Sequence, residues 1–200
     1  MVEKHKGKII LASKSPRRRV LLELIVPAAR IVVQESNVRE VMVEGESPEA
    51  FCMRVARDKA ASVWKKCSSK RGDVVAVIGA DTVISCEGEV IGQPMDREDA
   101  ARILRRLSGR QHKVLTGVAV LSTRLERYQT FTVTSVVRMH NLSDEIIADY
   151  VATDEPLDKA GAYAIQGEGS DLVASYDGSY TNIVGLPLEE LKQALAEVLE

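Results

Sequence analysis

The sequence predicts an α/β fold on a mixed sheet with flanking helices, and three observations support this prediction. Helix-start signals alternate along the chain with runs of β-branched residues. The connections between the expected strands are of two kinds, helical crossovers and short turns, which favours a mixed sheet over a doubly wound parallel one. The composition, 45% hydrophobic and 28% charged, is ordinary for a globular protein. We therefore expect one domain over residues 1–200, a length that also allows two small lobes sharing a cleft.

In the first half of the chain, serine followed by proline twice marks the start of a helix. Ser15 and Ser47 stand at the N-cap, and Pro16 and Pro48 at the first helical position. The second helix carries an apolar stripe, and the segment 37–45 before it is polar and irregular, as in a mobile loop. The expected helices cover 16–25 and 48–66, and the expected strands cover 8–12, 30–34 and 74–78.

The second half contains two hairpin signals. Strands at 83–85 and 90–91 flank a turn at 86–89, and the long Val- and Thr-rich strands 113–122 and 128–139 are expected to pair antiparallel. Helices are expected at 97–107, capped by Asp96 and closed by Gly109, at 144–152 after Ser143, and from Pro187 to the end. The segment 153–169 is expected to be rich in loops.

Charge and residue usage exclude several classes of partner. The net charge of −2 gives no overall attraction to nucleic acid, and no apolar run approaches the length of a membrane span. Cys52, Cys67 and Cys86 lack a C-x-x-C spacing, and His5, His112 and His140 lie far apart, so any metal should be held by oxygen ligands. These features fit a reducing, cytoplasmic setting without nucleic-acid or membrane partners.

The first chemical signal is Ser13-Lys14-Ser15-Pro16 followed by three arginines at the start of a helix. A helix amino terminus offers unpaired N–H groups and a positive dipole end, and guanidinium groups bind phosphate bidentately. Successive helical residues differ by about 100° of rotation, so at most two of the arginines can face one ligand. The alternative interpretation is a solvated first turn, although cations there oppose the helix dipole.

Two further signals involve carboxylates. Asp81, in Gly79-Ala80-Asp81-Thr82, is expected at the end of a buried strand, where it could hold a magnesium ion or accept a proton from water. Asp158 and Lys159 lie among Gly and Ala residues that allow close approach to a phosphate and its metal. The alternatives are a turn-forming aspartate in the first case and a surface salt bridge in the second.

Nine short blocks of the sequence follow one another in a specific order. They are Leu11–Arg18, Ala56–Ala60, Gly79–Thr82, Leu107–Gly109, His112–Val114, Thr116–Val118, Glu155–Tyr163, Ile165–Gly167 and Val184–Leu188. Each block is weak evidence alone, but their order and spacing are highly specific. With these blocks the sequence resembles the Maf family over nearly its whole length.

This resemblance implies a nucleoside-triphosphate pyrophosphatase that releases a monophosphate and pyrophosphate, using Mg²⁺ or Mn²⁺. It also implies a fold similar to the inosine-triphosphatase type, with two lobes around a cleft, and a homodimer. By similarity, Ser13, Arg17, Arg18 and Lys59 contact the triphosphate, and Asp81 is the proton acceptor or a metal-linked carboxylate. Glu40 would assist the metal, with Glu35 as the other candidate because the loop 37–45 departs from the family pattern. The sequence leaves open whether Asp81 binds metal, water or both.

Base specificity and one departure complete the prediction. Thr82 and Gln166 resemble the branch of the family that takes dTTP and UTP. Where the family usually has Gly-Lys-Pro, this chain reads Gly92-Gln93-Pro94, so a neutral amide replaces a cation that would face the triphosphate. The alternative is that position 93 lies at the rim of the pocket, where solvent screens a charge and the exchange matters little. The rival functions are a nucleotide-binding regulator of cell division without catalysis, a pyrophosphatase preferring 7-methyl-GTP, and a small phosphate-binding module of unrelated activity.

Overall fold

The computed structural model describes residues 7–66, 73–122 and 127–199, and within them the chain divides into two compact units. Unit 1 comprises residues 1–81, 116–133 and 185–200, and unit 2 comprises residues 82–115 and 134–184. His5 and Cys67, considered above as metal ligands, lie outside the described residues. No helix of the described part is long and apolar enough to cross a membrane.

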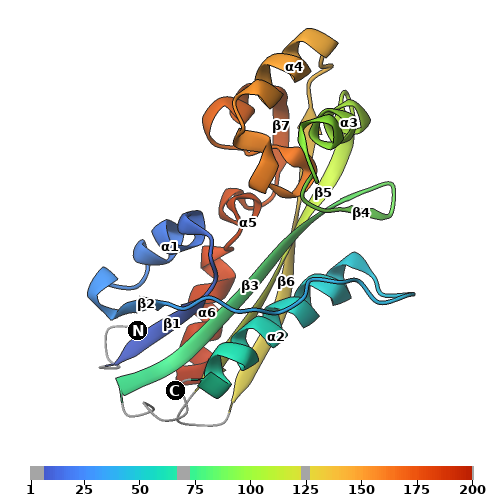
Figure 1. Cartoon of the computed structure of the whole chain (residues 1–200). Coiled ribbons are helices and arrows are strands. Elements are labelled where there is room, and N and C mark those ends of the chain that lie inside the picture. Colours follow the sequence, from blue (N-terminus) through green and yellow to red (C-terminus); the bar gives the residue numbers. More distant parts are fainter. Residues whose placement is uncertain (1–6, 67–72, 123–126, 200) are drawn as a thin grey trace. The chain divides into compact units, whose positions relative to one another are not determined.

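The sheet is mixed, as predicted, and three of its strands contribute residues to both units. Its order is β2-β1-β3-β5-β6-β7, with β4 paired to β3. The first three strands are parallel, whereas β3 with β4 and β6 with β7 are antiparallel. The strands, labelled in Figure 1, are β1 (Lys8–Ala12), β2 (Ile31–Val33), β3 (Val74–Cys86), β4 (Glu89–Ile91), β5 (Gln111–Ser122), β6 (Tyr128–Met139) and β7 (Val173–Asp177).

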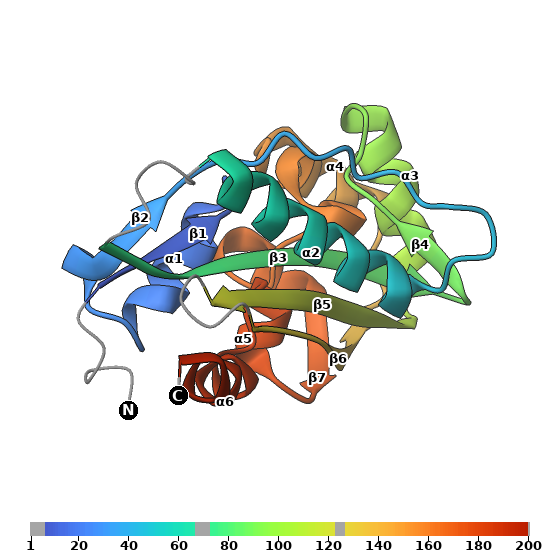
Figure 2. The same cartoon turned by 90° about the horizontal axis from the view of Figure 1, so that it is seen from below.

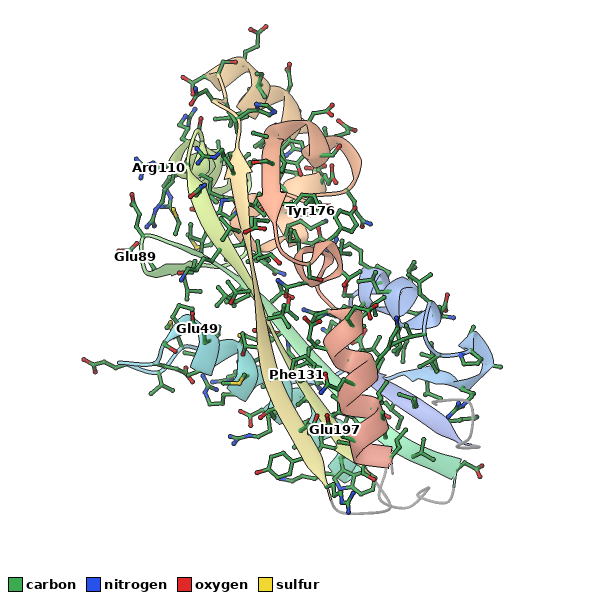
Figure 3. The ribbon with its side chains drawn as sticks, turned by 180° about the vertical axis from the view of Figure 1, so that it is seen from behind. Glu49, Glu89, Arg110, Phe131, Tyr176 and Glu197 are labelled. Atoms are coloured by element: carbon green, nitrogen blue, oxygen red, sulfur yellow. The ribbon has the colours of Figure 1, made fainter. Side chains whose placement is uncertain are left out.

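Unit 1 holds the helices α1, α2 and α6. In Figure 2, α2 lies on one face of β3 and β5, and α6 lies on the opposite face. The predicted apolar stripe of α2 is buried, and its Ala56, Ala60 and Val63 pack with residues of β1 and β3 in one core cluster. In Figure 3, α6 runs beside β6 near Phe131, and Gln129 on β6 donates a hydrogen bond to Glu197 on α6. The bounds are α1 Pro16–Glu23, the 3₁₀ turn η2 Ala28–Arg30, α2 Pro48–Lys66 and α6 Leu188–Leu199.

Unit 2 has its own hydrophobic core, in which α3 and α4 pack with parts of β3, β5 and β6. Asp96 and Ser143 accept hydrogen bonds from the first turns of α3 and α4, as their predicted capping roles require. Gly109 follows α3 with φ +68°, the left-handed conformation that a helix end favours. The bounds are α3 Arg97–Leu107, α4 Asp144–Ala152, η4 Glu155–Asp158, η5 Ala160–Ala162, η6 Gly167–Leu172 and α5 Tyr180–Val184.

The main error in the predicted elements concerns β3. The sequence predicts two strands, 74–78 and 83–85, with Asp81 after the first, whereas the structure has one strand of 13 residues, Val74–Cys86, with Asp81 inside it. Gly79 does not end the strand, because it serves as a contact surface for α2 instead. The sequence also gives no signal for β7 and α5, and α6 begins at Leu188, directly after Pro187.

Candidate functional site

The predicted phosphate-binding residues at the amino terminus of α1 lie close together in unit 1. Ser15 is the N-cap, and its Oγ accepts from the Arg18 N–H at 3.4 Å. The Ser13 Oγ is buried and accepts from the Ser15 N–H at 3.1 Å and from Arg18 Nη1 at 3.3 Å. Arg18 Nε also donates to the Gly185 carbonyl at 2.8 Å. The guanidinium of Arg18 is therefore fixed in place beside the start of the helix.

Lys59 lies between two carboxylates in the same unit. Its Nζ is 2.6 Å from Glu40 Oε1 and 2.7 Å from Asp81 Oδ1, and both Lys59 and Asp81 are buried. Glu40 comes from the loop between β2 and α2, Lys59 from α2 and Asp81 from β3. The ammonium group therefore holds together two acidic side chains from different elements.

Two glycines explain why α2 brings Lys59 so close to Asp81. A Cβ on Gly79 of β3 would lie 2.1 Å from the Ala56 carbonyl oxygen, and a Cβ on Gly117 of β5 would lie 2.3 Å from the Cys52 carbonyl carbon. The α2 backbone thus rests directly on these strands. Because strand side chains alternate, Asp81 points to the same face as Gly79, towards α2, and Thr82 is directed to the opposite face.

The charges of this cluster act on one another. Burial lowers the pKa of Arg18, and the neighbouring carboxylates Asp81 and Glu40 oppose this shift by favouring the charged form, while Arg17 adds to it. Arg18 and Lys59 therefore lie near the two carboxylates, and Arg17 adds a third positive charge beside Arg18. This excess of positive charge suits a polyanionic ligand such as a triphosphate.

Of the two candidate loop carboxylates, Glu40 is the one that reaches the cluster. Glu35 instead pairs with Lys14 at 3.6 Å, and both of those side chains are exposed. The sequence could not separate these two candidates, because their distance from Asp81 depends on the path of an irregular loop.

The remaining predicted site residues belong to unit 2. Gln93 is exposed and its Nε2 donates to the Asp158 carbonyl at 3.2 Å. Lys159 Nζ bonds to the Asp158 carboxylate and donates to the Glu155 carbonyl at 3.1 Å. Gln93, Asp158 and Lys159 are thus neighbours, as a shared role requires, and Gln166 is exposed after η5. The salt-bridge alternative for Asp158 and Lys159 is also met by this geometry.

The cluster supplies two carboxylates of the kind that bind a divalent metal. Among the described residues, no group of three or more His, Cys, Asp or Glu side chains comes together that could hold a metal. Glu40 and Asp81, however, share one cation, and Mg²⁺ commonly binds through one or two carboxylates together with substrate phosphates. The cysteines Cys52 and Cys86 are poor metal ligands in this fold. Both thiols are buried, and burial raises the pKa of Cys52 to about 11.

Comparison with known proteins establishes the fold and the family of this chain. The fold is that of a HAM1 protein from Coxiella burnetii, with a TM-score of 0.53 at 13% identity over 96% of this chain and 99% of that one. The chain thus has the open mixed-sheet fold of the inosine-triphosphatase type, as expected. The model of the Maf-like protein family matches residues 8–198, and the chain belongs to this family.

Several curated relatives are similar over nearly their full lengths. A protein of Geobacter sulfurreducens named dTTP/UTP pyrophosphatase is 45% identical over 96% of this chain and 97% of its own length. Proteins with the same name from Dictyoglomus turgidum and Bacillus velezensis are 46% and 43% identical, over 94% and 95% of this chain. The resemblance predicted from the sequence motifs is thereby confirmed.

Proposed function

We propose that this protein is a nucleoside-triphosphate pyrophosphatase that hydrolyses dTTP and UTP to the monophosphate and pyrophosphate. The observation that carries the proposal is the grouping of Arg18, Lys59, Glu40 and Asp81 beside a helix amino terminus, in a chain 45% identical to a dTTP/UTP pyrophosphatase. Phosphoryl transfer needs chiefly positioning and charge neutralisation, which these groups supply.

Each residue has a defined task in the proposed reaction. The α1 amino terminus with Ser13, Arg17 and Arg18 binds the triphosphate, and Lys59 leaves the carboxylates to contact a phosphate oxygen. The Asp81 carboxylate orients a water molecule and accepts its proton as the water oxygen bonds to the α-phosphorus. The bond from the α-phosphorus to the bridging oxygen breaks, and pyrophosphate leaves.

Glu40 and Asp81 would hold the divalent metal, Mg²⁺ or Mn²⁺. When bound, the metal would neutralise negative charge on the phosphates. The roles of the unit 2 residues stay predictions from the sequence: Gln93, Asp158 and Lys159 as phosphate contacts, and Thr82 and Gln166 as contacts to the polar edge of the pyrimidine. Homodimer assembly, a cytoplasmic location and the absence of nucleic-acid partners stay predictions from the sequence.

The test is pyrophosphate release by the purified protein from dTTP, UTP, GTP and 7-methyl-GTP with Mg²⁺ or Mn²⁺. We expect equal amounts of monophosphate and pyrophosphate, with dTTP and UTP preferred. Equal efficiency on GTP, or a preference for 7-methyl-GTP, would overturn the base assignment alone. Nucleotide binding without any product would instead favour a regulator that lacks catalysis.

A further inference from the structure

The segment that carries Glu40 is held by one side chain of α2. Arg54 Nε donates to Glu46 Oε1 at 2.7 Å, and Arg54 Nη2 donates to Glu46 Oε2 at 2.8 Å. The same Nη2 donates to the Val41 carbonyl at 2.9 Å, directly after Glu40. A single guanidinium thus fastens the segment 40–46 to α2 at two places, using the bidentate geometry that suits arginine.

Glu46 also shapes the segment itself. Its N–H donates to the Val43 carbonyl at 3.0 Å, and its Oε2 accepts from the Val43 N–H at 3.2 Å. Gly45 supplies the positive φ of +78° that this turn uses. The turn therefore positions the Glu46 carboxylate, and Arg54 binds this carboxylate through two hydrogen bonds.

Apolar burial contributes little to holding this segment. Val41 and Val43 are 67% and 59% exposed, and the Glu40 side chain is half exposed. Arg54, in contrast, lies against the Phe51 ring, 5.5 Å from its centroid, and within 3.7 Å of Asp58 on the next turn of α2. The hydrogen bonds between Arg54 and Glu46 lower the pKa of Glu46 and raise that of Arg54.

We infer that Arg54 is a positioning residue of the site: by clamping the segment 40–46 to α2, it keeps Glu40 against Lys59 and therefore beside Asp81. Arg54 and Lys59 stand on the same helix, so one rigid element fixes both the loop and its partner cation. The kinetic part of this inference rests on the proposed function, whereas the order of the loop does not.

A double-mutant cycle tests whether Arg54 acts through Glu40. We expect Arg54→Gln to lower kcat about tenfold, to raise the metal concentration needed for half-maximal rate, and to change KM for dTTP by less than about threefold. In a Glu40→Gln background, the same substitution should change kcat by less than about twofold. Arg54→Lys should recover part of the rate, because lysine keeps the charge but not the fork. Additive effects of Arg54→Gln and Glu40→Gln would overturn the inference.

Limited trypsin digestion gives a measurement independent of activity. Cleavage after Arg39 should be faster in Arg54→Gln and in Glu46→Gln than in the wild type. The matched control is Arg57→Gln, an exposed arginine on the same helix that pairs with Asp58 rather than with the loop. If Arg54→Gln and Glu46→Gln are cleaved after Arg39 at the wild-type rate and also melt at the wild-type temperature, the inferred clamp is wrong. If the wild type releases no pyrophosphate, the proposed function fails, and the digestion still decides whether Arg54 holds the loop.

Discussion

Lys59 illustrates at the residue scale how a buried charge can be kept in a fold. Removing a charge from water is costly, and an ion pair repays this cost only with good geometry. Lys59 has two carboxylates within 2.7 Å, one of them buried and the other half exposed. The arrangement therefore satisfies the cation in the protein and leaves Glu40 in contact with solvent.

Asp81→Asn should separate binding from chemistry. We expect turnover to fall by a factor on the order of 10²–10⁴, because a positioned general base contributes that much, while the dissociation constant for dTTP changes little. Stability should fall modestly, since Lys59 keeps Glu40 and an amide oxygen. Glu35→Gln is the control and should leave both quantities unchanged, as the Glu35 side chain is exposed and pairs with the exposed Lys14. Near wild-type turnover in Asp81→Asn would remove this carboxylate from the mechanism.

Gln93→Lys should raise kcat/KM by a few-fold to roughly tenfold, or about one kcal/mol of transition-state stabilisation. Gln93 is exposed and bonds to the Asp158 carbonyl, so a lysine fits at this position, and its charge would stabilise a phosphate more than the amide does. Steady-state kinetics at low and high salt give the measurement. An unchanged or lower kcat/KM at both salt concentrations would show that position 93 does not face the triphosphate.

His112 makes unit 2 sensitive to acid. Burial lowers its pKa from the ordinary 6.5 to about 4; its Nε2 bonds to the Tyr163 hydroxyl at 2.7 Å, and its Nδ1 is buried without a partner. Between these two pKa values the unfolded chain binds a proton at this histidine and the folded chain does not. The free energy of unfolding therefore falls by about 3 kcal/mol in all as the pH is lowered from about 6.5 to 4. Urea unfolding at pH 7 and pH 4.5 should show a smaller difference for His112→Gln than for the wild type. His140→Gln, at an exposed position, is the control; an equal pH dependence in all three proteins would contradict the assignment.

At the scale of elements, α2 organises unit 1. Its buried stripe packs on β1 and β3, its backbone rests on Gly79 and Gly117, and its polar side chains hold Asp81 and the loop 40–46. The same helix therefore serves both the core and the site. A shift of α2 should disturb both.

Gly79→Ala tests this coupling. The added methyl group would lie 2.1 Å from the Ala56 carbonyl oxygen and 2.9 Å from the Ala60 nitrogen, and both are backbone atoms that move only with the helix. We expect a loss of stability of roughly 1–3 kcal/mol, as for other overpacked cores, together with reduced turnover. Gly92→Ala, where nothing lies within 4 Å of the new Cβ, should unfold at nearly the wild-type temperature. A Gly79→Ala protein as stable as the wild type would show that α2 can move away from β3 without a loss of stability.

At the scale of the whole molecule, metal should matter for catalysis more than for folding. Lys59 already neutralises Glu40 and Asp81 within the protein, so we expect EDTA to abolish pyrophosphate release while leaving the melting temperature of the nucleotide-free protein nearly unchanged. Added Mg²⁺ should restore the activity. A rise of several degrees with Mg²⁺ alone would show that the metal binds firmly without nucleotide, against the competition that Lys59 implies.

The sequence by itself determined the elements whose signals are local. The caps Ser15, Asp96 and Ser143 and the apolar stripe of α2 depend only on neighbours along the chain, and all of these predictions are confirmed. The motif blocks also determined the family, because their order does not depend on how the chain packs.

Only the tertiary structure decided how the site is assembled. Gly79 reads locally as the end of a strand, yet it lies inside β3 because the backbone of α2 needs the space of its missing side chain. The choice of Glu40 over Glu35, the burial of Lys59 and the clamp by Arg54 all depend on contacts between residues distant in sequence. Such contacts leave no periodic pattern in the sequence, and they arise only once α2 is packed against the sheet.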